Sequence, residues 1–164
     1  MASSTALLNQ IQDEVVRRLK EDLSFEPLED DPVRRIDPDN ITVRKVADLE
    51  KPIDTPAIIV TGGRQVSVPA SGGTNERDDY PFSVVIQIID NDSGDQYQNR
   101  ATYQEWGEKI ARAFNQQTLS GIPDVYIGLA AQINYLDPKI MQRHRQFVGG
   151  VVGVFIARLT RGIT

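Results

Sequence analysis

The residues Tyr80-Pro-Phe-Ser-Val-Val-Ile-Gln-Ile-Ile-Asp90 decide the fold of this chain of 164 residues. The stretch is apolar from Val84 to Ile89 except for Gln87, and such a run predicts a central strand that is covered on both faces. A second apolar run, from Gln146 to Leu159, contains three glycines and Arg158. It is shorter than the roughly 18 residues that a membrane span requires. We therefore predict that this second run is a buried strand that closes the sheet.

Amphipathic helices are predicted on either side of the first strand. Before it, apolar residues recur every four positions, which places them on one side of a helix whose other side is charged. Ser3 or Ser4 can serve as the N-cap of this helix. This stripe is typical of a helix packed on a sheet, although contact with a partner chain is a second possibility. After the strand, a helix is predicted over Ala101–Phe114, with Thr102 and Glu105 at capping-box spacing. The two stripes comprise Leu7, Ile11, Val15, Leu19 and Leu23, and then Tyr103, Trp106, Ile110, Ala113 and Phe114.

Three further strands are predicted at Ile41–Val46, Ala57–Val60 and Val125–Tyr135. Because strands follow one another near the end of the chain, an antiparallel or mixed sheet is favoured over a doubly wound parallel one. The length is typical of one domain, so residues 1–164 are predicted to form a single unit. The predicted fold class is α+β, with a mixed, mostly antiparallel sheet, an N-terminal helix, a second central helix and projecting loops.

Two segments are predicted to project from this sheet. Residues 26–56 hold five prolines, which remove backbone donors, and we interpret them as an extended arm or surface connection. Residues 61–79 are polar and contain two Gly-Gly pairs, which indicates a hairpin or flexible loop with a possible strand at Gln65–Pro69. Both segments are longer than typical connections, so a role in contacts is one interpretation.

The charge of the chain is unevenly distributed. The formal net charge is −5 at pH 7, yet residues 137–164 contain one acid and five bases. The acidic total, and the lack of any block of five like charges in the sequence, argue against nucleic-acid binding as the main role. The first residues have no cationic region followed by an apolar one, so no secretory signal is predicted.

The sequence contains no recognisable catalytic or metal-binding motif. It has no cysteine, and its single histidine, His144, cannot form a paired zinc site. The Asp-rich stretch 90–95 fails the EF-hand pattern at positions 5, 6 and 12. The acidic clusters 29–31 and 78–79 are predicted to lie in solvated loops. We therefore expect no enzymatic activity, no cofactor and no metal.

The order and spacing of these elements resemble those of the tail terminator proteins of long-tailed bacteriophages, also called tail completion or head–tail joining proteins. The residues that carry the resemblance are the helix Leu7–Leu23, the strand Phe82–Asp90, the helix Ala101–Phe114 and the closing apolar strand. The resemblance implies a virion structural protein, assembled in the host cytoplasm. It would form a six-membered ring on the tail tube, stop tube polymerisation and join the tail to the head connector.

The partners that this resemblance implies are other copies of the chain, the tail tube protein and the connector or neck proteins. Genomic DNA would pass through the channel without specific binding, and no membrane is involved. The candidate contact residues are Arg64, Arg77, Asp78, Asp79, Lys139, Arg143 and Arg145. Three alternatives stay open: another neck protein such as a connector adaptor or stopper, a small ligand-binding or regulatory α+β domain with an apolar pocket, and, third, an enzyme.

Overall fold

The computed structural model describes residues 6–45, 54–63, 77–91, 99–115, 117–119, 121–122, 125–134 and 145–160, with the backbone alone at 77–78, 126–134 and 160. The elements agree with the predicted α+β class. In chain order they are helix α1 (Leu7–Glu21), the short 3-10 helix η1 (Pro38–Asn40), strands β1 (Ile41–Val43), β2 (Ala57–Gly62) and β3 (Arg77–Asn91), helix α2 (Arg100–Phe114), and strands β4 (Val125–Asn134) and β5 (Gln146–Thr160).

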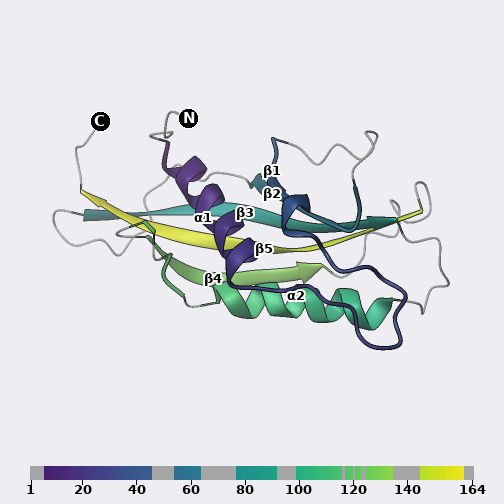
Figure 1. Ribbon diagram of the computed structural model, residues 1–164. Coiled ribbons are helices and arrows are strands. Elements are labelled where there is room, and N and C mark those ends of the chain that lie inside the picture. Colours follow the sequence, from purple (N-terminus) through teal and green to yellow (C-terminus); the bar gives the residue numbers. More distant parts are fainter. Residues whose placement is uncertain are drawn as a thin grey trace.

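The five strands form one sheet in the order β1-β2-β3-β5-β4 (Figure 1). Only β1 and β2 run parallel, so the sheet is mixed and mostly antiparallel, as predicted. Its centre is the pair of β3 and β5, which match residue for residue from Arg77 opposite Thr160 to Asn91 opposite Gln146. At the usual rise per residue, this two-stranded ribbon is roughly 45 Å long. It exceeds the neighbouring strands at both ends.

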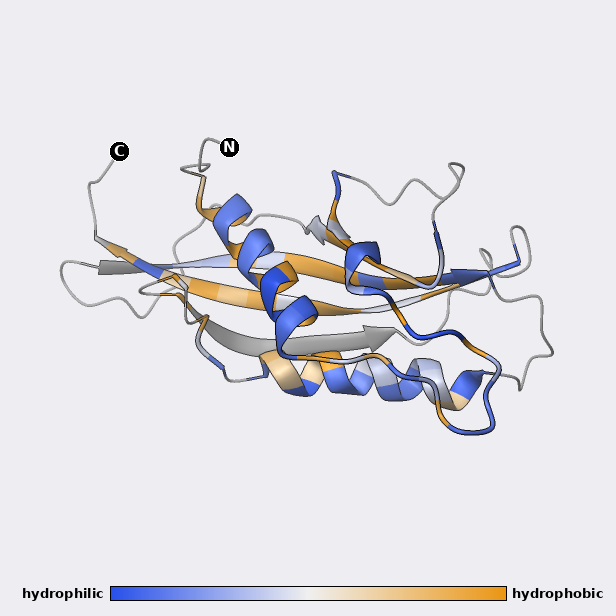
Figure 2. Cartoon of the chain, in the orientation of Figure 1, coloured by the Kyte–Doolittle hydropathy of each residue, from blue (hydrophilic) through white to orange (hydrophobic). Residues whose placement is uncertain are grey.

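Both helices lie on one face of this sheet. Helix α1 packs against β1 and β2, and α2 packs against β4 and β5 (Figure 1). The apolar stripe of α1 is fully buried at Ile11, Val15 and Leu19, so it faces the sheet and not a partner chain. Alternate residues of β3 and β5 complete this core, which accounts for the largely hydrophobic central strands in Figure 2.

The opposite face of the sheet is covered over only part of its length. Ile59 and Ile89 point to this face and are fully buried. Farther along the ribbon, Val85, Val154 and Ile156 are half-buried. The prediction of a strand covered on both faces therefore holds for the C-terminal part of β3 and is wrong for its middle.

The helix caps differ from those predicted. The N-cap of α1 is Ala6, which has no capping side chain, in place of Ser3 or Ser4. The N-cap of α2 is Asn99, with a left-handed backbone (φ 64°), so Thr102 lies inside the helix and no capping box with Glu105 forms. Sequence spacing identifies a possible cap, but the end of a helix is set by where its backbone stops packing.

Residues 26–45 do not form a free arm. Their backbone is irregular apart from η1 and β1, as the prolines predict. Nevertheless Val33 and Ile36, together with the preceding Phe25, are buried in the main core. Three apolar side chains within twelve residues hold this segment against the domain. This corrects the expectation of an extended arm and agrees with the alternative of a surface connection. Residues 46–53 of the predicted arm lie outside the described residues.

The centre of β5 approaches β3 too closely for a side chain. A Cβ atom added at Gly150 would lie 2.2 Å from the carbonyl oxygen of Ile86. On its other side, β5 pairs with β4, whose register shifts between Ile127 and Leu129 and again between Ala130 and Ile133. Glycines in one strand and bulges in its neighbour increase the local twist and bend of a sheet.

We predict that Gly150→Ala lowers the free energy of unfolding by at least about 2 kcal/mol, because the backbone of β3 must move to admit the methyl group. Gly62→Ala is the matched control. Its Cβ would meet only the ends of two side chains, Leu8 Cδ2 at 3.3 Å and Gln12 Nε2 at 3.6 Å. Urea unfolding of both variants measures the difference, and equal losses would show that the close approach at Gly150 does not matter.

Candidate assembly surfaces

The sequence-predicted contact residues do not form one site. Arg77, Asp78 and Asp79 lie at the start of β3, whereas Arg145 directly precedes β5. Because these strands are antiparallel along their full length, the start of β5 lies at the end of the ribbon opposite the start of β3 (Figure 1). Arg145 precedes Gln146, which pairs with Asn91, so it lies at the end opposite the other three. The remaining candidates, Arg64, Lys139 and Arg143, lie outside the described residues.

Asp79 is part of a strand and not of the projecting loop predicted for residues 61–79. Its side chain is only 11% exposed and pairs with Arg158, directly opposite on β5. Arg158 Nε and Nη2 donate to the two carboxylate oxygens at 2.7 and 3.0 Å. Such a two-pronged contact is among the stronger ion pairs in proteins. The prediction of a solvated acidic loop is therefore wrong for Asp79, which helps to close this end of the ribbon.

Arg145 is exposed at the other end of the ribbon. Its backbone is left-handed, with φ 51°, which is uncommon for a residue with a side chain. The next residue, Gln146, donates from Nε2 to Asn91 Oδ1 at 3.1 Å across the ribbon. The local structure thus presents a cation at a fixed point where β5 begins.

The segment between α1 and η1 crosses the outside of α2. We call residues 24–31 the α2 strap. Side chains of α2 bind its backbone: Lys109 Nζ donates to the carbonyl of Ser24 at 2.8 Å, and Trp106 Nε1 donates to that of Glu26 at 2.9 Å. One turn earlier on α2, the hydroxyl of Thr102 accepts from the backbone N–H of Leu28 at 3.1 Å. The strap therefore runs antiparallel to the helix along one of its faces.

The strap also supplies a cap for α2. The carboxylate of Asp31 accepts from the backbone N–H of Thr102 at 3.2 Å and from its hydroxyl group. This is the contact that an N-cap side chain normally provides, here from 71 positions earlier in the sequence. Beneath the strap, Trp106 is fully buried, and the ring of Phe25 meets it edge-on at 6.2 Å.

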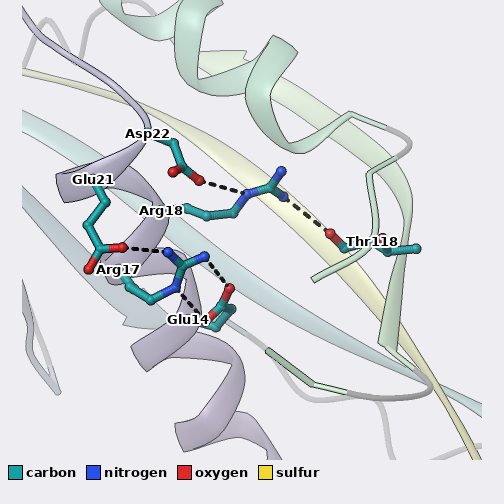
Figure 3. Close-up of polar contacts among 6 residues, drawn as sticks. All are labelled: Glu14, Arg17, Arg18, Glu21, Asp22 and Thr118. Atoms are coloured by element: carbon teal, nitrogen blue, oxygen red, sulfur yellow. Dashed lines mark hydrogen bonds and ion pairs between the residues drawn. The ribbon is translucent and has the colours of Figure 1, made fainter. Parts of the chain in front are cut away.

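A polar network covers the outer face of α1 (Figure 3). The guanidinium nitrogens of Arg17 donate to the carboxylate of Glu14 at 2.8 and 2.9 Å and to that of Glu21 at 2.6 Å. These hydrogen bonds raise the pKa of the Arg17 guanidinium above its usual range. Arg18 Nε lies 3.6 Å from a carboxylate oxygen of Asp22, and Arg18 Nη1 donates to the carbonyl of Thr118 at 3.3 Å (Figure 3). The second contact links α1 to the segment after α2. Both arginines of α1 are thus paired within the chain.

Two open cavities lie among the described residues. One, of about 430 Å³, lies beside η1, and one, of about 370 Å³, lies between the end of α1 and α2. Charged residues make up more than half of the lining residues in each cavity. The first is lined by Arg34, Arg35, Asp37, Asp39, Asn40, Asp54, Thr55 and Pro56, and the second by Leu23, Glu105, Glu108, Lys109, Arg112 and Ala113.

Within the part of the chain that the structure describes, no three histidine, aspartate or glutamate side chains are placed to hold a metal ion. Neither of the described helices has both the length and the apolar character of a membrane-crossing helix. Sequence reasoning missed the partners of Asp79 and Asp31. A signal was present for the first, because Arg158 interrupts an apolar strand and a buried charge requires a partner. For Asp31 no sequence pattern indicates Thr102.

We predict that Asp31→Ala destabilises the protein by about 1 kcal/mol, since it removes a helix cap. Trp106 is the only tryptophan, so its emission reports on the strap. It should move to longer wavelength as the strap loosens. Asp30→Ala, at an exposed neighbouring position, is the control and should leave both urea stability and emission unchanged. A loss of equal size in both variants would argue against a capping role.

We also predict a coupling energy of about 1–2 kcal/mol between Asp79 and Arg158, because the carboxylate is mostly buried and held by two hydrogen bonds. A double-mutant cycle with Asp79→Ala and Arg158→Met measures it by chemical unfolding. The pair of Arg112 and Glu108 is the matched control. Its side chains are 81% and 45% exposed, so a coupling of at most about 0.5 kcal/mol is expected. Similar couplings in both cycles would contradict the prediction.

Comparison with known proteins does not assign the chain to a family. No protein-family model matches it, and no curated protein matches it.

Proposed function

We propose that this chain is a virion structural protein of a long-tailed bacteriophage, which forms a ring on the tail tube, ends tube polymerisation and joins the tail to the head connector. The observation that carries the proposal is the set of four elements on which the resemblance rests. Helices α1 and α2 and strands β3 and β5 occur in the expected order, with bounds within a few residues of those expected. The pattern that resembles tail terminators is thus a folded unit.

The two ends of the ribbon suit a closed ring. Head-to-tail contacts in a ring join two different surfaces of the same chain. At one end lie the Asp79–Arg158 pair and Leu159, which is 39% exposed. At the other end lies the exposed Arg145. The ends differ in chemistry and are separated by the length of the ribbon, so one can contact the other on a neighbouring copy.

The strap belongs to the same end as Arg145. Tyr103, near the start of α2, donates to Asp90 at 2.7 Å and stacks on Phe147 at a centroid distance of 4.0 Å. These contacts fix the start of α2 beside the start of β5. The strap therefore presents its exposed acidic residues, Glu29 and Asp30, at this end. An end with both charge signs can dock with orientation-dependent contacts.

The overall charge fits a channel that passes DNA. With a formal net charge of −5, the chain repels the phosphate backbone on average. A ring with this charge would let genomic DNA pass without holding it. The remaining partners in the proposal are the tail tube protein and the connector or neck proteins, and the place of action is the tail or neck of the virion.

The test is native mass spectrometry over a range of protein concentrations, with negative-stain imaging and a tube-extension assay. We predict rings of about six copies with an open channel, as the resemblance implies. When these rings are added to polymerising tail tubes, the tubes should stop growing. A strict dimer that retains a small molecule would overturn the proposal in favour of a ligand-binding domain. Rings that bind connector proteins but leave tube growth unchanged would identify a different neck protein.

Charge-reversal variants refine this test. We expect Arg145→Glu to weaken ring formation by about tenfold or more, since it removes a cation from an intersubunit surface. Glu108→Lys, on the outer side of α2, is the control and should leave the rings intact. If both variants form rings as the unaltered chain does, the Arg145 end of the ribbon is not the contact surface.

A further inference from the structure

The α2 strap occupies α2 in the manner of a bound peptide. The helix recognises the strap backbone by side chains on successive turns, from Lys109 through Trp106 to Thr102. The contacts to Ser24 and Glu26 go to carbonyl oxygens, which any extended segment offers. Two strap residues contact α2 through their side chains. The ring of Phe25 packs against Trp106, and the carboxylate of Asp31 binds Thr102.

Few side chains fix the α2 strap to the rest of the domain. Between the partly buried Leu23 and the buried Val33, Phe25 is the only strap side chain in the core. Glu26, Leu28, Glu29 and Asp30 are exposed, and Leu28 is one of the three most exposed large apolar residues among those described. A segment with one buried apolar anchor and hydrogen bonds near solvent opens at a lower free energy than the whole fold.

Opening the strap would leave α2 intact. The helix keeps its other side against β4 and β5, with Ile110 fully buried and Phe114 packed edge-on against Phe155 at 6.1 Å. The surface uncovered would be an aromatic recess at Trp106, flanked by the hydroxyl of Thr102 and the ammonium of Lys109. The cavity of about 370 Å³ that borders Lys109 continues this surface along the helix.

We propose that this face of α2 is a docking groove for an extended segment of a partner protein, and that the α2 strap closes it in the free chain. The strap itself shows which segment fits. It has an aromatic residue for the recess, a carbonyl one position later for Trp106 Nε1, and a carboxylate six positions after the aromatic residue for Thr102. Prolines at positions 27 and 32 favour the extended backbone. The proposal does not depend on the ring function.

The tether explains why the groove is closed in the free chain. The strap is joined to α1 on one side and to η1 on the other, so its local concentration at α2 is about millimolar. A free peptide of similar contacts cannot compete at lower concentration. A partner that is itself held beside the domain by other contacts experiences a similar local concentration and can replace the strap.

The test uses the synthetic peptide Ser-Phe-Glu-Pro-Leu-Glu-Asp-Asp, which copies residues 24–31 and contains no tryptophan. In the Phe25→Ala variant the strap loses its anchor, and Trp106 emission should move to longer wavelength. Added peptide should bind this variant at least tenfold more tightly than the unaltered chain and restore the original emission. The same peptide with alanine in place of phenylalanine should not restore it.

Circular dichroism establishes that the variant is folded before binding is measured. If Phe25→Ala does not fold, Asp31→Ala replaces it, since that change removes the two hydrogen bonds from Thr102 and leaves the core whole. The proposal is wrong if a folded variant fails to bind the peptide, if the unaltered chain binds it equally well, or if the two peptides behave alike.

Discussion

Fifteen consecutive residue pairs between β3 and β5 are the constraint on which the rest of the structure depends. Because side chains alternate along a strand, this single register decides which residues of both strands face the helices. It places Ile86 and Val151 together in the core and sets Asp79 opposite Arg158. The shorter strands and both helices pack against the surface that this pair defines. A shift of the register by one residue would turn the core-facing side chains of one strand to the other face of the sheet.

Around this ribbon, α2 joins parts of the chain that are far apart in the sequence. Its inner side packs on β4 and β5, its start is fixed to the ribbon by Tyr103, and its outer side binds the strap. Thr102 is central to these contacts, since it bonds both Leu28 and Asp31. These two hydrogen bonds join residues that are 74 and 71 positions apart in the sequence.

Hydrophobic pattern was sufficient to predict most of the fold, because burial of one face is what the pattern records. The stripe of α1 and the apolar runs of β3 and β5 were located to within a few residues. Pairings between distant polar residues were not predictable. The partners of Asp31 and Asp79 are set by the path of the strap and by the register of the sheet. Arg158, as a charge within an apolar strand, indicates only that a partner is needed, and nothing in the sequence connects Asp31 with Thr102. For the same reason the proline-rich composition of residues 26–56 does not distinguish an extended arm from a surface connection, although Val33 and Ile36 are core residues.

The close approach at Gly150 gives the ribbon a mechanical property. A long two-stranded ribbon with side chains packed evenly along it resists bending. Here the middle of β5 has glycines at 149, 150 and 153, and β4 shifts register beside them, so bending concentrates at this point. The relative direction of the two ends of the ribbon, at Asp79 and at Asn91, therefore depends on these glycines and bulges more than on any other part of the strand pair.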